Sequence, residues 1–427
     1  MRRRLPLAAA AAWLLAVPAA ADVVTASSTT VVTAGRPYRD GSLTSAVPVY
    51  ELVSISASEM KTSWGEFEAT LSAWGAVDGS DIRFWQNGAP VGSRATGDVD
   101  VAYLRGDLRS RKLTVRLGRQ VIVEGNARML HLDGAQIVVR PSRGFGLSLY
   151  GGAPVAPRFD ARGTAFTTGN TLATVAYGGR AYWSLAGLLE LGVSGSMATA
   201  DGDLTRKDVG ADLRITPHHR VEITSSGFYN LPEKRVGQVD VAVGFEAQRT
   251  LRLAVDYQHV EPDLFLPRNS ILSVFAADKR NDFGGGLRWT PMRTIAVDAD
   301  YHLLKAEDGN GSRARLKGTY RPYGRWVVGA DFQLLKVPEN GYWLARAFAS
   351  RELGRFAATL DGWFYRYDKQ VNGQDQSLGG TVTGSMQLAP SWRVALAGTA
   401  GSDPFYKSRL DVMAKLVWNQ LYTREVR

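Results

Sequence analysis

Residues able to do acid–base or nucleophilic chemistry are few in this chain of 427 residues. It has five histidines and no cysteine, which excludes thiolate metal sites, cysteine nucleophiles and disulfide scaffolds. His259 and His302 lie near Glu261 and Asp300, a pairing that could orient a base, but no serine stands in a nucleophile motif around them. A phosphate-binding glycine loop and a His-Glu-x-x-His zinc motif are also absent. We therefore predict no enzymatic activity, no cofactor and no metal site.

Charged side chains alternate with apolar ones along many segments, such as 209–215, 239–246 and 251–258. Because successive side chains of a strand point to opposite faces, each segment has one apolar and one polar face. The polar face is predicted to line a lumen. Its residues are Arg206, Asp212, Arg214, Asp240, Arg252, Asp256, Asp298, Asp300, Arg313, Arg315, Lys317, Asp331, Arg346 and Asp361.

The basic run Arg313, Arg315 and Lys317 leaves two interpretations open. These residues either pair across strands with Asp298 and Asp300, or form part of a mixed-charge track that solvates a polar solute.

Three features distinguish a membrane-spanning barrel from a soluble β-sandwich, which would show the same alternation. Many segments are 10–14 residues long, whereas soluble strands average ~5–6 residues and tilted transmembrane strands need about 9–11. Tight turns alternate with longer connections, the longest being 78–97, 121–133, 152–170 and 262–278. Tryptophans lie near the tight turns, as in the aromatic girdles of membrane barrels: Trp183, Trp289, Trp326 and Trp392.

The predicted fold is therefore all-β, a single antiparallel up-and-down transmembrane β-barrel of about 20 strands, with a range of 18 to 22. A barrel is apolar on its outer half only, which fits a hydrophobic fraction of 45% together with a mean hydropathy of −0.15. The barrel is expected to occupy residues 48–427, although the weak alternation over 49–58 leaves a strand there open.

The N-terminus has the pattern of a secretory signal peptide over residues 1–21. Three arginines precede an apolar run that ends in small residues before Asp22. Its removal lowers the formal charge from +10 to +7, which does not call for a nucleic-acid partner. Residues 22–47, rich in Thr, Ser, Val and Ala, are expected to form a flexible periplasmic lead-in.

The segment 121–133 carries apolar residues that are unusual in an exposed loop. It either folds into the lumen as a constriction, packs on the barrel rim, or continues its neighbouring strand. The polar residues of the constriction would be Glu124, Arg128, His131 and Asp133. The apolar segment 262–278 is a second candidate for the same role.

Three short motifs, at 117–120, 132–135 and 149–152, resemble a recurrent stretch of porin-like outer-membrane barrels. The stretch is similar in particular to the alginate-export type and to barrels of exopolysaccharide secretion. The resemblance covers about 35 residues and implies a passive channel, with Arg119 and Asp133 at the pore interior or rim. The mixed charge of this lumen differs from the strongly basic alginate-type lumen.

The sequence thus predicts an outer-membrane channel of a Gram-negative bacterium that passes polar solutes, with both termini periplasmic. The alternatives are an exopolysaccharide conduit with periplasmic export proteins, and a barrel-based enzyme or adhesin. The expected partners are outer-membrane lipid, the barrel-assembly machinery and periplasmic chaperones.

Overall fold

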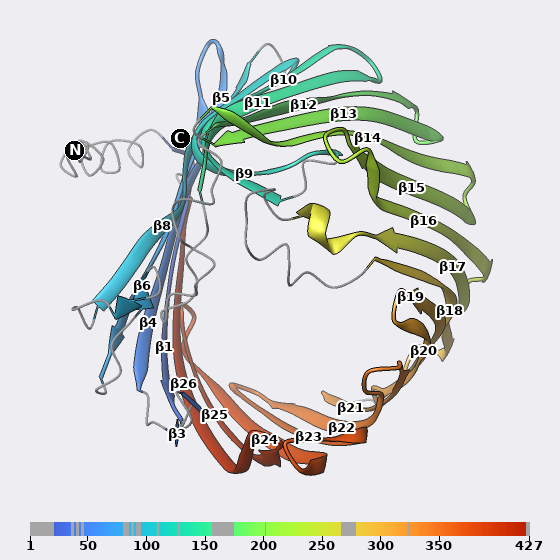
Figure 1. The fold of residues 1–427 in the computed structure, drawn as a ribbon. Helices are drawn as coiled ribbons and strands as arrows, with labels where there is room; N and C mark the ends of the chain where they lie inside the picture. The colour runs from blue at the N-terminus through green and yellow to red at the C-terminus, as the bar shows by residue number, and fades with distance from the viewer. Residues whose placement is uncertain are drawn as a thin grey trace.

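The protein forms one closed ring of antiparallel strands in a computed structural model (Figure 1). The structure describes residues 21–35, 38–39, 42–43, 47–79, 85–86, 89–90, 95–108, 111–125, 129–155, 175–200, 202–265, 279–322 and 325–423. Across these residues one sheet contains 22 strands, more than the 20 predicted and at the upper limit of the predicted range. None of the helices in these ranges is long and apolar enough to cross a membrane.

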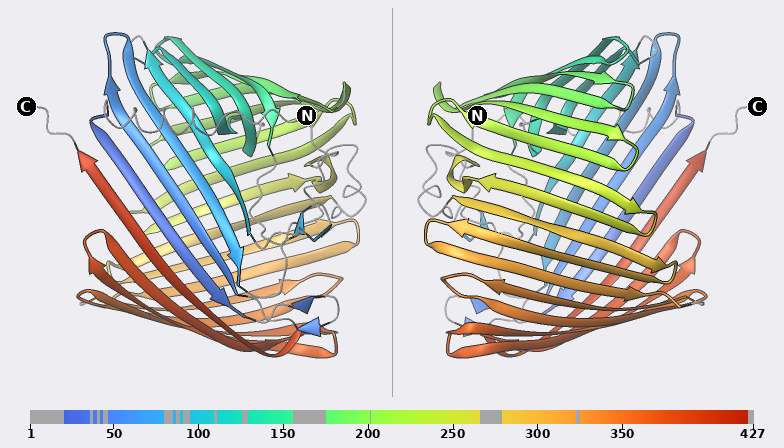
Figure 2. Two further views of the ribbon diagram at one scale, coloured as in Figure 1. Left: turned by 90° about the vertical axis from the view of Figure 1, so that its left-hand side faces the viewer. Right: turned by 90° about the vertical axis from the view of Figure 1, so that its right-hand side faces the viewer.

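The strands follow one another around the ring in chain order and run obliquely in both side views (Figure 2). They are β1 (Val23–Ala34), β4 (Pro48–Lys61), β5 (Gly65–Asp78), β8 (Ala95–Leu108), β9 (Leu113–Val123), β10 (Met129–Ser142), β11 (Phe145–Pro154), β12 (Val175–Leu185), β13 (Leu189–Ala200), β14 (Asp203–His218), β15 (Val221–Asn230), β16 (Arg235–Gln248), β17 (Leu251–Val260), β18 (Arg280–Met292), β19 (Ile295–Ala306), β20 (Gly309–Tyr320), β21 (Trp326–Lys336), β22 (Tyr342–Leu353), β23 (Phe356–Val371), β24 (Gln374–Ala389), β25 (Trp392–Asp403) and β26 (Tyr406–Thr423).

Four two-residue strands and one short helix complete the described elements. Two small hairpins are formed by β2 (Tyr38–Arg39) with β3 (Ser42–Leu43), and by β6 (Trp85–Gln86) with β7 (Ala89–Pro90). The 3₁₀ helix η4 (Pro262–Phe265) follows β17, and Figure 1 shows it within the ring of strands.

Strand β1 closes the barrel, which contradicts the flexible lead-in predicted for 22–47. It pairs with β26 from Val23↔Thr423 to Ala34↔Val412, and on its other edge with β4. Closure leaves no sheet edge with a row of unpaired N–H and C=O groups. The β-branched residues of β1 favour a strand, but hydroxyl groups on both faces conceal its period-two pattern. The open question over 49–58 is also answered, since β4 spans it.

One face of the wall points into the ring, and the register identifies it. Figure 1 shows the end of β9 inside the ring, and a Cβ on the adjacent Gly125 would lie 3.3 Å from Arg180 Cδ on β12. The face of Arg180 is therefore the inner one, and strand pairing carries this assignment from strand to strand. On the opposite, outer face large apolar side chains are exposed, among them Leu316, Phe332 and Leu378.

Both ends of the described chain lie at the end of the barrel that carries the tight turns, because Val23 pairs with Thr423 beside them. The two-residue turn between β22 and β23 shows how these connections are made. Gly354 there has a φ of +63°, a conformation that costs glycine little and other residues more. The signal peptide over 1–21 lies outside the described residues, apart from Ala21.

The segment 121–133 is mostly strand, which confirms the last of the three alternatives, that it continues its neighbouring strand. β9 extends to Val123 and β10 begins at Met129, and the two pair from Val123↔Met129 to Leu113↔Val139. Two apolar residues of this segment are internal: Ile122 and Leu132 are fully buried against Tyr150 and Ala176. The second candidate, 262–278, is described only as far as Phe265.

Candidate functional site

The inner face of the barrel carries the predicted charged residues, with one exception described below. Each of them alternates along its strand with outward-facing residues, as Asp331 does with Ala330 and Phe332. Glycines on this face leave room for large neighbours. A Cβ on Gly284 would lie 2.4 Å from His302 Nδ1, which explains why glycines occur in this part of β18.

Most inner-face charges are paired across strands. Arg315 Nη2 lies 2.5 Å from Asp331 Oδ2, and Arg346 pairs with Asp361. Arg288 Nε lies 3.2 Å from Asp298 Oδ1. Two members of the basic run on β20 form cross-strand pairs. Arg313 Nη2 lies 3.7 Å from Asp282 Oδ2 on β18, and Arg315 pairs with β21 instead of Asp300, which lies directly opposite it on β19.

Further around the ring, other predicted residues join local hydrogen-bond clusters. Asp212 accepts from Arg180, and Asp240 accepts from Gln258 Nε2 at 2.7 Å. On β14, Arg206 donates to Asp208, whose side chain is fully buried. The wall is thus bound together by charge-assisted hydrogen bonds, which are shorter and stronger than neutral ones.

The two histidines considered for catalysis are held by acceptors on neighbouring strands. His302 Nδ1 lies 2.7 Å from Asp282 Oδ1 and 3.6 Å from Asp256 Oδ2. His259 Nδ1 lies 2.9 Å from Asn281 Oδ1, and its Nε2 is 3.7 Å from Glu261. Within the described residues no group of three or more His, Cys, Asp or Glu side chains is placed to hold a metal ion.

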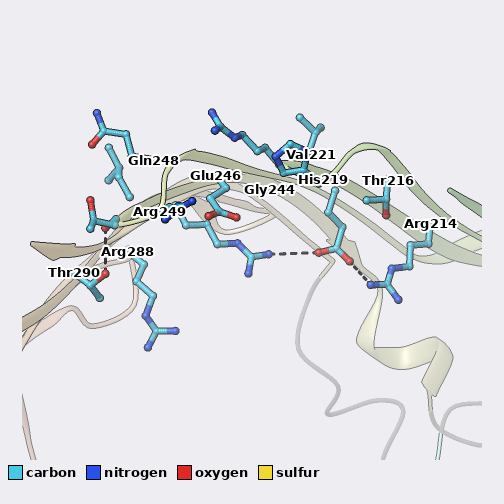
Figure 3. A pocket seen from close by; sticks show the side chains of 15 residues that line it. Arg214, Thr216, His219, Val221, Gly244, Glu246, Gln248, Arg249, Arg288 and Thr290 are labelled. Atoms are coloured by element: carbon cyan, nitrogen blue, oxygen red, sulfur yellow. Dashed lines mark hydrogen bonds and ion pairs between the residues drawn. The ribbon is translucent and has the colours of Figure 1, made fainter. Parts of the chain in front are cut away.

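A basic cavity of about 330 Å³ lies on the inner wall at the tight-turn end (Figure 3). Glu222 bridges two arginines there, at 2.9 Å from Arg214 Nη2 and 3.5 Å from Arg252 Nη2. Arg288 stands directly opposite Arg252 in the register, an arrangement of like charges that is unfavourable in a sheet. All three guanidinium side chains are more than 60% exposed, so water reaches them inside the ring.

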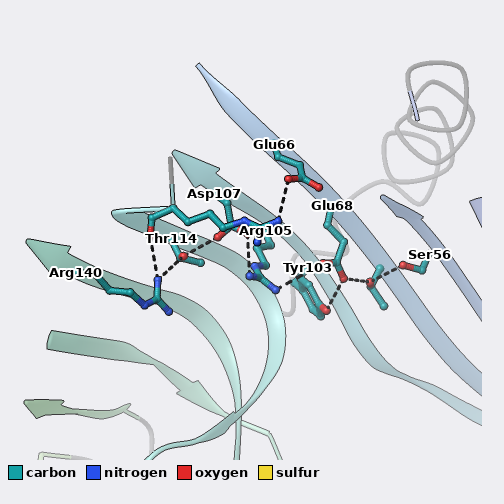
Figure 4. A network of polar contacts seen from close by, with 10 residues as sticks. Ser56, Glu66, Glu68, Tyr103, Arg105, Asp107, Thr114 and Arg140 are labelled. Carbon is teal, nitrogen blue, oxygen red and sulfur yellow. Dashed lines mark hydrogen bonds and ion pairs between the residues drawn. The ribbon is translucent and has the colours of Figure 1, made fainter. Parts of the chain in front are cut away.

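A second polar network crosses β4, β5, β8, β9 and β10 near the same end (Figure 4). Tyr103 donates to Glu68 Oε1 at 3.1 Å, and Arg105 pairs with Asp107 at 2.8 Å. Thr114 donates to Asp107 at 2.6 Å and accepts from Arg140. Sequence reasoning did not assign this network, although the alternation of Glu66 and Glu68 in β5 was a usable signal.

The structure places the predicted constriction residues in different positions. Glu124 lies against the inner wall, where its Oε1 accepts a hydrogen bond from Gln136 Nε2 at 2.8 Å. His131 lies in β10, not in a loop, and its Nε2 donates to the Asp100 carbonyl at 2.5 Å. Arg128 lies outside the described residues.

Arg119 and Asp133 do not line the lumen, so that expectation was wrong. Arg119 shares the face of Leu117, which is exposed on the outer side, and donates to Asp133 Oδ1 at 2.8 Å. Its Nη1 also donates to the carbonyl of Val99 at 2.7 Å. The physical reason is the alternation of β9, in which Arg119 follows Leu113, Val115 and Leu117 on the apolar outer face.

No protein-family model and no curated protein matches the chain. Solved structures do match. The "Copper transporter OprC" has a TM-score of 0.53 at 11% identity, covering 92% of this chain and 80% of that one. The "P pilus usher (PapC) translocation pore" has a TM-score of 0.49 at 9% identity, with 93% and 100% covered. OccAB4 of Acinetobacter baumannii has a TM-score of 0.49 at 9% identity, with 94% and 98% covered.

At these identities the likeness concerns the fold alone, and it is the fold of porin-like outer-membrane β-barrels. The finer resemblance to alginate-export barrels stays a prediction.

Proposed function

We propose that this protein is an outer-membrane channel that passes polar solutes through an aqueous lumen without chemistry. The observation that carries the proposal is the division of one closed wall into two faces. Leu316 and Phe332 are exposed on the outside, while Arg214, Arg252 and Arg288 stand more than 60% exposed on the inside. An apolar exterior suits lipid, and a charged, solvated interior suits water.

The width of the barrel supports the same conclusion. Barrels of about 16 or more strands have an interior wider than their own side chains can fill, and this ring has 22. Inner-face charges paired along the wall keep the wall rigid and leave polar groups facing the lumen. Such a lumen needs no nucleophile, metal or cofactor to pass a hydrated solute.

The test is conductance in planar lipid bilayers with protein refolded from detergent. We expect stepwise increases in ion current, together with gel migration that changes on boiling, as for closed barrels. A protein that shows the boiling shift but gives no current would contradict the channel while leaving the barrel intact. A protein that stays in aqueous solution and shows no shift would contradict both.

Export of an exopolysaccharide, assisted by periplasmic export proteins, is a second candidate with its own supporting feature. A cavity of about 550 Å³ on the inner wall of β24–β26 and β1 is lined by Thr33, Thr381, Thr383 and Thr399. Hydroxyl groups both donate and accept hydrogen bonds, as a neutral sugar chain requires. Loss of surface polysaccharide in a deletion strain, restored by the wild-type gene, would favour this function over general solute passage.

Delivery to the outer membrane would require the predicted signal peptide, periplasmic chaperones and the barrel-assembly machinery. N-terminal sequencing of the mature protein tests the first of these. We expect it to begin at Asp22, directly before β1, so that the closing strand keeps its full length. A start within or beyond β1 would contradict both the cleavage site and the closure of the mature barrel by this strand.

A further inference from the structure

The outer face of the barrel contains a hollow of about 780 Å³ over β19–β24. Its floor is formed by small residues, and its rim by exposed or half-exposed Leu316, Phe332, Phe364 and Leu378. These residues alternate along their strands with Lys317 and the other lumen-facing charges, so their side chains point to the outer face. A concave apolar surface on the side that faces lipid calls for an apolar occupant.

The floor of this groove is a row of small residues that the strand register aligns. Gly318, Ala330, Ala347 and Gly362 stand opposite one another on β20–β23, and Gly380 continues the row on β24. At a strand spacing of about 4.8 Å the row is about 19 Å long. It rises through the barrel wall, because Gly318 lies two residues from the tight-turn end of its strand and Gly380 lies nine.

The lower end of the groove opens at a cationic and aromatic cluster on the same face. Trp326 and Arg351 stand opposite each other at the tight-turn ends of β21 and β22, and the guanidinium carbon lies 4.8 Å from the ring centroid. Trp289 and Tyr320 are exposed on the neighbouring strands. Aromatic rings of this kind mark the level of the lipid headgroups, and an arginine beside them can bind a phosphate.

We infer that the groove binds one anionic phospholipid of the periplasmic leaflet, with an acyl chain along the small-residue row and the phosphate at Arg351. The inference rests on the proposed membrane location and goes beyond the channel function. Apolar surface selects the chain, and the positive charge at the lower end selects the anionic headgroup. The rise of the row from the headgroup level toward the middle of the wall matches the path of a lipid chain.

A second copy of this chain fits the groove less well. Contact about a two-fold axis places the same surface patch on both subunits. Two concave grooves would then face each other and leave a void, which forfeits packing. A wild-type dimer in detergent would be the sign of this occupant.

The test is native mass spectrometry of delipidated protein in detergent, titrated with phosphatidylglycerol or with zwitterionic phosphatidylcholine. Gly318→Leu and Gly362→Leu fill the groove. Both can be accommodated, because a Cβ meets nothing within 4 Å at Gly318 and only a carbonyl at 3.9 Å at Gly362. Gly398→Leu is the matched control, an outward glycine with open space that lies outside the groove lining.

The headgroup contact is tested with Arg351→Gln, against Arg366→Gln at the opposite end of the outer face. We expect one tightly bound phosphatidylglycerol on the wild type and on both control variants. Binding should be lost in Gly318→Leu and Gly362→Leu, and weakened about fivefold in Arg351→Gln.

Equal binding by the groove variants and the Gly398→Leu control would overturn the proposal, as would a wild-type dimer that Gly362→Leu converts to monomers. Conductance measured on the same preparations separates this failure from failure of the channel. Variants that conduct like the wild type but do not differ in lipid binding contradict the lipid site alone.

Discussion

The inner wall of the barrel has two arcs that differ in how their strands are tied together. In the charged arc, β14–β23, carboxylates and guanidiniums pair between neighbouring strands, as Arg315 does with Asp331. In the hydroxyl arc, β24–β26 with β1 and β4, threonines and serines face the lumen, and Thr381 shares a hydrogen bond of 2.8 Å with Thr399. Pairs within a single strand occur in both arcs, Arg409–Asp411 here and Arg206–Asp208 in the charged arc.

The difference separates two tasks that one wall must perform. Charges buried at the wall need partners, so the charged arc is a connected network in which each removal leaves an unpaired group. Hydroxyl groups are satisfied by one another or by lumen water, so the hydroxyl arc tolerates change. The charged arc should therefore govern stability and ion selectivity, while the hydroxyl arc provides a neutral surface.

The largest effect is expected from removal of a buried carboxylate in the charged arc. Asp208 is 1% exposed and accepts from Arg206 and from Asn230 Nδ2, the latter at 3.0 Å. Asp208→Ala leaves the buried Asn230 amide and the half-buried Arg206 guanidinium without this acceptor, which should cost about 3 kcal/mol of unfolding free energy. Urea titration followed by tryptophan fluorescence measures it. A loss no greater than that of Thr399→Val would remove the distinction between the arcs.

A smaller loss is expected where a glycine of the charged arc lies against a neighbouring side chain. Gly284→Ala would place Cβ 2.4 Å from both His302 Nδ1 and the Tyr301 carbonyl, and relieving this overlap should cost about 1–3 kcal/mol. Gly384→Ala on β24 is the control, because a Cβ there meets nothing within 4 Å. The same urea titration should show no loss for the control. Equal unfolding free energies of the two variants would mean that the neighbours of Gly284 move aside at no cost.

The two arcs also differ in how far the sequence alone could describe them. Alternating charges allowed the inner face of the charged arc to be predicted, and residues such as Asp331 and Arg346 lie on that face as predicted. The inner face of β1 could not be predicted in this way, because Ser and Thr occur on both of its faces. Arg119 failed for a different reason: its place in the pore came from the resemblance alone, whereas the alternation of β9 puts it on the apolar outer face with Val115 and Leu117.

The effect of the charged arc on ion selectivity should be smaller in free energy than these stability losses. It contrasts the two arcs more directly, because it measures passage through the lumen. The triple variant Arg214→Gln, Arg252→Gln, Arg288→Gln removes three exposed lumenal charges, so anion permeability relative to cations should fall about threefold at 0.1 M KCl. At 1 M KCl, where the Debye length is about 3 Å, the difference should nearly vanish. Reversal potentials across a salt gradient report it. A shift that persists at 1 M would point to altered pore width instead of charge.

The smallest effect is expected in the hydroxyl arc. In the double variant Thr381→Val, Thr399→Val, both members of one hydrogen bond are replaced by apolar groups of the same shape, which is close to neutral for stability. We expect an unfolding free energy within about 0.5 kcal/mol of the wild type and an unchanged reversal potential. Uptake of a neutral sugar by proteoliposomes should slow, because the wall then offers fewer hydroxyl partners. A reversal-potential change like that of the arginine variant would show that ions follow the hydroxyl arc, and that the two arcs share one path.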